Sequence, residues 1–122
     1  MNRITVKVGS IQMPVELNDS ETARKVVDAL PIRSRARVWG EEIYFDTELC
    51  LLEEAPKDHA PPGTVAYWPQ GKAICLFFGQ KPASPVTIIG RMRGNPRDLA
   101  AVHPGDDVAV RLFNEDEKDA PR

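Results

Sequence analysis

Aromatic side chains that also carry a polar group are the residues of this sequence best suited to binding a ligand. Indole and phenol rings give a ligand an apolar surface, and neighbouring carboxylate, amide and guanidinium groups can orient it by hydrogen bonds. Both tryptophans and a tyrosine lie next to such polar residues. We therefore predict a ligand-binding cleft formed by Trp39, Glu41, Tyr67, Trp68, Gln70 and Arg91.

The same residue types can instead pack in a core, with their N–H and hydroxyl groups hydrogen-bonded locally. We favour this structural role for three aromatic residues, Tyr44, Phe77 and Phe78. Packing and ligand binding stay equal alternatives for Trp39, Trp68 and Arg91.

Carboxylate-based hydrolysis by Glu41 and Glu42 is a further hypothesis, but their spacing disfavours it. Adjacent residues of an extended chain point to opposite faces and form a poor general acid and base pair. The sequence has no phosphate-binding glycine loop, and its cysteines and histidines lack the spacing of metal ligands. We therefore expect neither a metal nor another cofactor, and we expect Cys50 and Cys75 to be buried free thiols.

Composition limits the classes of function. The chain has 122 residues with a net charge of −2, and its pI is about 5.7, which disfavours binding to nucleic acid. No apolar run is long enough to span a bilayer, and the N-terminus lacks the pattern of a signal peptide. The expected location is the cytoplasm, without a membrane partner.

Two helices are predicted to hold these residues in place. Residues 19–30 carry apolar side chains at helical spacing. The segment Asn18-Asp19-Ser20-Glu21 offers several helix caps, with Asn18 and Glu21 at the spacing of a capping box. Asn95 followed by Pro96 predicts the start of a short helix over residues 96–102.

The remaining segments predict short β-strands. Residues 3–8 and 11–17 alternate between polar and apolar residues around a Gly-Ser turn, which indicates a hairpin. A second hairpin is predicted over residues 65–79, and its strand 73–78 is apolar at every position, so both of its faces should be covered. Many short strands with few helices predict a closed or nearly closed antiparallel β-barrel. We expect one domain over residues 1–113 and a charged, disordered tail over residues 114–122.

Several segments together resemble the small prokaryotic cyclophilin-like family. These are Trp39-Gly40-Glu41-Glu42-Ile43-Tyr44-Phe45, Ala66-Tyr67-Trp68-Pro69-x-Gly71-x-Ala73-x-Cys75-x-Phe77-Phe78-Gly79, Pro82-x-Ser84 and Ile88-Ile89-Gly90-Arg91. The resemblance covers nearly the whole chain and implies the cyclophilin β-barrel. The members of this family are stand-alone domains without a settled biochemical role.

True cyclophilins are peptidyl-prolyl cis–trans isomerases that use an arginine, a glutamine, a histidine and an aromatic pocket. The resemblance places Arg37 at the position of that arginine, because an apolar pair and a glycine follow it. The Gln-Gly-Gly segment is absent, and Glu41-Glu42 replaces the Pro-Gly-Phe segment. We therefore predict a non-catalytic module that either binds a peptide or small ligand or serves as an accessory domain. A weak or atypical prolyl isomerase that uses Arg37 is the alternative.

Overall fold

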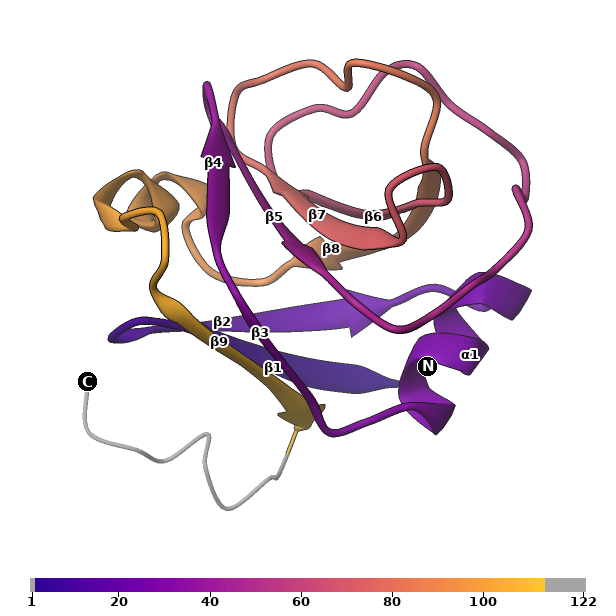
Figure 1. Cartoon of the computed structure of the whole chain (residues 1–122), viewed down its shortest axis with the longest axis horizontal. Coiled ribbons are helices and arrows are strands. Elements are labelled where there is room, and N and C mark those ends of the chain that lie inside the picture. Colours follow the sequence, from indigo (N-terminus) through magenta and orange to yellow (C-terminus); the bar gives the residue numbers. More distant parts are fainter. Residues whose placement is uncertain (1, 114–122) are drawn as a thin grey trace.

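The computed structural model of the chain describes residues 2–113. The predicted tail, residues 114–122, lies outside the described residues. Nine antiparallel strands form one sheet that curls into a nearly closed barrel (Figure 1). Along the sheet the strands follow the order β3-β9-β1-β2-β8-β6-β7-β5-β4. The predicted fold class is confirmed.

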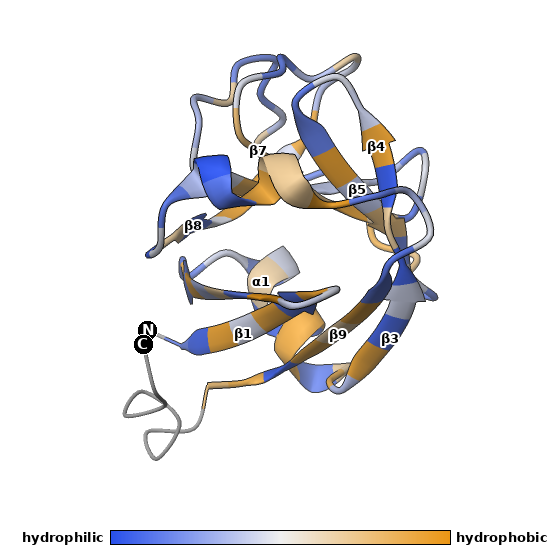
Figure 2. Ribbon diagram, turned by 90° about the vertical axis from the view of Figure 1, so that its left-hand side faces the viewer, coloured by the Kyte–Doolittle hydropathy of each residue, from blue (hydrophilic) through white to orange (hydrophobic). Residues whose placement is uncertain are grey.

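The strands are short, and three consecutive pairs of them are joined by tight turns. Their bounds are β1 Arg3–Val8, β2 Ile11–Leu17, β3 Ile32–Arg35, β4 Arg37–Trp39, β5 Glu42–Asp46, β6 Thr64–Trp68, β7 Ala73–Phe77, β8 Thr87–Met92 and β9 Asp107–Leu112. Figure 2 shows hydrophilic and hydrophobic residues alternating along strands such as β3, β4 and β5. This alternation directs one face of each strand to the core.

The chain itself bridges the two ends of the sheet. Strands β3 and β4 are the two edges in the pairing order, yet only Ala36 separates them in sequence. Strand β3 pairs with β9, whereas β4 pairs with β5. The Ser34 hydroxyl donates a hydrogen bond of 2.7 Å to the Asp46 carbonyl oxygen across the seam. One continuous segment thus brings β5 and β9 to neighbouring positions on the barrel wall.

The first helix is shorter than predicted. Helix α1 spans Glu21–Asp28 rather than residues 19–30, and its N-cap is Ser20, whose hydroxyl accepts a hydrogen bond of 3.1 Å from the Ala23 N–H. Of the several caps that residues 18–21 offer, Ser20 is the one used, whereas the Asn18 amide donates to the Ile88 carbonyl oxygen. The carboxylate of Glu54, a residue of the loop before β6, also accepts hydrogen bonds from the Glu21 and Thr22 N–H groups at the helix N-terminus.

The second predicted helix, residues 96–102, is a 3₁₀-helix. It spans Pro96–Ala101, and the Asn95 side chain accepts a hydrogen bond of 3.0 Å from the Arg97 N–H. Asparagine as the N-cap before proline was predicted, and it is confirmed. No helix within residues 2–113 is both long enough and apolar enough to cross a bilayer.

Strand β7 separates two hydrophobic clusters. Ile74 and Leu76 belong to the main cluster inside the barrel, whereas Cys75 and Phe77 belong to a smaller cluster on the opposite face. Every residue of β7 is buried, so the prediction that both faces are covered is confirmed. The outer face is covered by loops rather than by a second sheet (Figure 1).

Candidate ligand pocket on the outer face of the barrel

The register of three strands, β4, β5 and β7, gathers polar and aromatic side chains on one patch of the outer barrel face. Trp39 lies opposite Glu42, and Glu42 lies opposite Phe77 on the next strand. Two residues further along β5, Tyr44 lies opposite Cys75. Alternate residues of a strand share a face, so these five side chains project to the same side.

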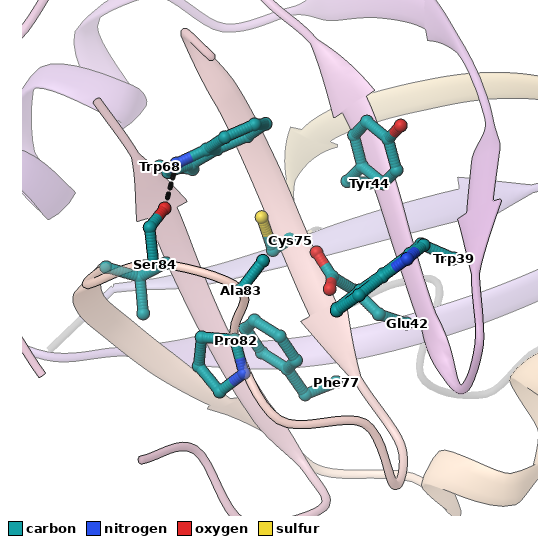
Figure 3. A pocket seen from close by; sticks show the side chains of 10 residues that line it. Trp39, Glu42, Tyr44, Trp68, Cys75, Phe77, Pro82, Ala83 and Ser84 are labelled. Carbon is teal, nitrogen blue, oxygen red and sulfur yellow. Dashed lines mark hydrogen bonds between the residues drawn. The ribbon is translucent and has the colours of Figure 1, made fainter. Parts of the chain in front are cut away.

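The loop between β7 and β8 crosses this patch and forms a wall over it. Its residues Pro82, Ala83 and Ser84 lie in front of the sheet in Figure 3. The Ser84 hydroxyl oxygen is 2.8 Å from Trp68 Nε1, which donates a hydrogen bond to it. The loop ends at Val86, whose backbone exchanges hydrogen bonds of 2.8 and 2.9 Å with Lys57. The end of the loop is therefore held by β6 and by the loop that precedes β6.

Between this loop and the sheet lies a cavity of about 220 Å³. Its walls are mainly apolar, and the residues that line it are Trp39, Glu42, Tyr44, Trp68, Cys75, Phe77, Pro82, Ala83, Ser84 and Val86. Sites for drug-sized molecules usually measure about 300–1,000 Å³. This cavity accordingly suits a compact ligand, or a single side chain of a peptide.

Aromatic rings define the shape of the pocket. The rings of Tyr44 and Trp68 meet edge to face, with centroids 6.3 Å apart and an interplanar angle of 86°. A Cβ atom at Gly71 would lie 2.3 Å from the Trp68 ring, so only glycine lets the turn before β7 pass so close. Trp39 stands at the other side with 44% of its surface exposed. It is the most accessible ring of the pocket.

Glu42 is a buried carboxyl group in this apolar setting. Figure 3 shows its side chain pointing into the space among Trp39, Cys75 and Ala83. Burial raises the pKa of Glu42, and a hydrogen bond with the Cys75 thiol lowers it in part. None of the ion pairs among the described residues includes Glu42. The carboxyl group thus lacks the cationic partner that buried carboxylates usually have.

Cys75 serves Glu42 as a hydrogen-bond donor and is a poor nucleophile. Burial raises its pKa, and the neighbouring Glu42 charge and hydrogen bond raise it further. A thiol with a raised pKa stays protonated, and the thiolate is the reactive form. Cys75 is a buried free thiol as predicted, whereas the same prediction is wrong for Cys50, which is free but exposed.

Two of the predicted ligand residues, Trp39 and Trp68, line this pocket together. Tyr67 lies on the opposite side of the same strand, in the barrel core. Its hydroxyl donates to the Leu49 carbonyl oxygen at 2.8 Å and accepts from the Leu51 N–H at 3.2 Å. Tyr67 therefore anchors the segment after β5 and does not reach the pocket.

The other predicted ligand residues lie outside the cavity wall. Glu41 is exposed and pairs with Arg97, with 3.0 Å between Oε2 and Nη1. Gln70 is exposed in the turn between β6 and β7. The Arg91 guanidinium is exposed and donates a long hydrogen bond of 3.5 Å to the Pro62 carbonyl oxygen. These three residues and the pocket do not form one cleft.

Arg37, the arginine of the isomerase hypothesis, flanks the pocket without lining it. Its Nη2 atom is 2.8 Å from Asp46 Oδ2, and its guanidinium carbon is 5.9 Å from the centre of the Tyr44 ring. The Tyr44 ring is part of the pocket wall. Arg37 therefore contacts one wall from outside and is already engaged by a carboxylate.

The sequence-based site omitted Glu42, Tyr44, Cys75, Phe77 and the loop over them. The alternation in Glu42-Ile43-Tyr44 and in Cys75-Leu76-Phe77 was a usable signal, because each pair shares a face. Which face carries a cavity depends on the loop from residue 78 to 86, and periodicity does not place loops. Within the described residues, no three His, Cys, Asp or Glu side chains are grouped as a metal site.

Comparison with known proteins places this fold in a family. The cyclophilin-like family model matches residues 2–111. The solution structure of the hypothetical protein AF2241 from Archaeoglobus fulgidus shares 40% sequence identity, with a TM-score of 0.80. That match covers 92% of this chain and 95% of the archaeal one.

A more distant likeness concerns the structure of McbB in complex with tryptophan. The TM-score is 0.66 at 17% identity, and the match covers 88% of this chain. This chain spans only 44% of the McbB chain, so the likeness is one of fold. A search of curated proteins found no match. The match over residues 2–111 shows that this chain belongs to the cyclophilin-like family.

Proposed function

We propose that this protein is a binding module for a small ligand with a ring-shaped, apolar body. The observation that carries the proposal is the cavity of about 220 Å³ between the loop at residues 82–84 and the outer barrel face. Its size favours a compact molecule, or one side chain of a peptide, over an extended peptide. Aromatic walls suit a ring, because two rings at edge-to-face or offset geometry attract each other.

The fold relative McbB binds tryptophan, a small molecule with an aromatic ring. At 17% identity this relationship supports the fold and not the ligand. It nevertheless supplies a compound to try on this chain. We therefore include free tryptophan, followed by NMR, beside the simple phenyl compounds described next.

The protein contains its own reporter for a binding test. It has two tryptophans, Trp39 and Trp68, and both line the pocket. We expect 2-phenylethanol, which does not absorb or emit at tryptophan wavelengths, to change the intrinsic fluorescence in a saturable manner. Ligands gain between about 0.3 and about 1.5 kcal/mol per non-hydrogen atom, and at the lower value a molecule of this size binds only at millimolar concentration, so the titration should extend to that range.

Matched variants separate pocket binding from surface effects. Ala83→Phe fills the cavity from an exposed loop position and should abolish the saturable change. Ala100→Phe makes the same change on the exposed surface of the 3₁₀-helix and should leave the titration unaltered. Equal binding by both variants, or none by the wild type with any probe, would contradict the proposal.

Prolyl isomerisation is the second candidate function, and the placement of Arg37 favours it. The guanidinium lies over the Tyr44 ring, next to the pocket that would take a proline ring. An isomerase stabilises a twisted amide by donating hydrogen bonds to it. A protease-coupled assay at high protein concentration tests this function, with Arg37→Lys as the control. Rates equal to those of the uncatalysed reaction would rule it out.

A further inference from the structure

We infer that the ligand of this pocket carries a cationic nitrogen on its ring-shaped body, and that this nitrogen pairs with the Glu42 carboxylate. The inference rests on the proposed binding function and names the chemical class of the ligand. Three independent features of the pocket lead to it, namely an unpaired acid, ring faces and a small volume.

The first feature is the state of the acid. Glu42 is buried, with 6% of its surface exposed. Among the described residues its side-chain partner is the Cys75 thiol, a weak neutral donor. A buried carboxylate without a cation is costly, and proteins normally supply an arginine or lysine for it. Here the charged partner is missing on the side that faces the cavity. A ligand ammonium group would supply it.

The surroundings supply no other charge within the pocket. Among the titratable residues of β5 and β7, Tyr44 and Cys75 line the pocket with Glu42, while Asp46 does not, and the overlying loop contributes Pro82, Ala83 and Ser84. Arg37 and Arg97 are engaged by other carboxylates, since Arg37 pairs with Asp46 and Arg97 pairs with Glu41. Lys81, next to Pro82 in sequence, is exposed. Glu42 is therefore the group that decides the charge preference of the pocket.

The second and third features concern how a cation would be held. The faces of aromatic rings carry negative electrostatic potential and attract ammonium groups, and the pocket walls include two indoles and a phenol. A cavity of about 220 Å³ has room for one small ring and a short amine, so the amine must lie near the carboxylate. A ligand carboxylate would meet Glu42 as a like charge and is disfavoured.

Binding of a cation should also be linked to protons. Burial raises the pKa of Glu42 in the free protein. An ammonium partner favours the ionised form, so the pKa falls in the complex and binding releases a proton. The affinity for an amine should therefore rise as the pH increases through the free-protein pKa of Glu42. The affinity for a neutral alcohol should lack this rise.

Three probes of similar shape test the inference by tryptophan fluorescence and calorimetry: phenethylamine, 2-phenylethanol and phenylacetate. A primary alkylamine stays protonated between about pH 5 and pH 8, so its own charge is constant in that range. Near pH 8 we expect phenethylamine to bind at least about tenfold tighter than the alcohol, because a charge-assisted hydrogen bond contributes at least that factor. Phenylacetate should bind most weakly.

Two neighbouring glutamates provide a matched pair of variants. Glu42→Gln should remove the preference for the amine and the pH dependence while the alcohol still binds. Glu41→Gln makes the same chemical change on the exposed side of the turn and should keep the amine preference. Binding of the alcohol as tightly as the amine by the wild type, or an amine preference that survives Glu42→Gln, would overturn the inference and leave the proposed function standing. If none of the three probes binds, both fail.

Discussion

The two faces of β7 differ in how tightly they are packed. Toward the barrel interior, Ile74 and Leu76 pack among aliphatic side chains. Toward the outside, Cys75 and Phe77 form the floor of a cavity that also contains the Glu42 acid. Tight packing stabilises a fold, whereas a gap with a polar group in it forgoes contacts that packing would give. From this contrast we expect the inner face to contribute most to stability, and we propose ligand recognition for the outer one.

The largest loss of stability should come from a cavity made on the inner face of β7. Leu76 is fully buried in the barrel core, so Leu76→Ala should lower the free energy of unfolding by about 2–5 kcal/mol. Cys75→Ala, one residue earlier on the outer face, removes less volume beside an existing cavity and should cost clearly less. Urea unfolding followed by circular dichroism gives both values. An equal or larger loss for Cys75→Ala would contradict the division between the faces.

The next largest loss of stability should come from removing the Tyr67 hydroxyl, which lies on the inner side of the barrel wall. Tyr67→Phe leaves the Leu49 carbonyl oxygen and the Leu51 N–H without their side-chain partner, which should cost about 1–3 kcal/mol of unfolding free energy. Binding of 2-phenylethanol should be unchanged, since Tyr67 does not line the pocket. A loss of affinity at unchanged stability would instead support the ligand-binding role predicted from the sequence.

The contributions of Glu42 and Glu54 to stability should change with pH in opposite directions, because Glu42 is buried and Glu54 accepts hydrogen bonds. Hydrogen bonds from the Thr22 hydroxyl, the Thr22 N–H and the Glu21 N–H lower the pKa of Glu54. The folded state thus holds the Glu54 proton less tightly than the unfolded state. Its stabilising contribution is present above the ordinary carboxyl pKa and is lost as the pH falls through the lowered one.

Glu42 has the opposite sign. Because burial raises its pKa, the folded state binds the proton more tightly, and stability declines as the pH rises from the ordinary carboxyl pKa to the raised one. Thermal unfolding between about pH 2 and pH 8 should show Glu42→Gln gaining stability relative to the wild type as the pH rises. Glu54→Gln should lose ground over its own, lower range. Parallel pH profiles for the two variants would refute this assignment.

The smallest effect on stability should come from the mouth of the pocket. Trp39 is 44% exposed, so Trp39→Ala should change the unfolding free energy by only about 0.5 kcal/mol while it weakens 2-phenylethanol binding several-fold. Leu112, another large apolar residue with 53% exposure, does not line the pocket and serves as the control. Similar affinities for Trp39→Ala and Leu112→Ala would argue against a role for Trp39 in binding.

The fold was largely predictable because it depends on local patterns. Alternation of polar and apolar residues predicted the N-terminal hairpin, and the apolar strand of the second hairpin predicted two covered faces. Helix ends were less accurate, since Asn18 and Ser20 can both cap and tertiary contacts decide between them. The Asn18 amide bonds Ile88, which lies 70 residues away, and this leaves Ser20 as the cap.

The pocket was only partly predictable because it depends on contacts between strands. Trp39 and Trp68 were named correctly as neighbours of one cavity, but Tyr67 and Trp68 are adjacent in a strand and cannot both face it. Glu42 meets Phe77 and Tyr44 meets Cys75 through the register of β5 and β7, which no short sequence pattern specifies. The position of the loop at residues 82–84 is likewise a tertiary property.

The central claim is that the outer face of β5 and β7 binds a small cationic ring compound, and chemical-shift mapping tests it most directly. On titration of the labelled protein with phenethylamine, we expect saturable shifts at residues 42–44, 75–77 and 82–84 and at both indole N–H signals. Glu42→Gln should weaken these shifts at the same positions. Saturable shifts that cluster elsewhere on the barrel, or none at millimolar ligand, would contradict the account.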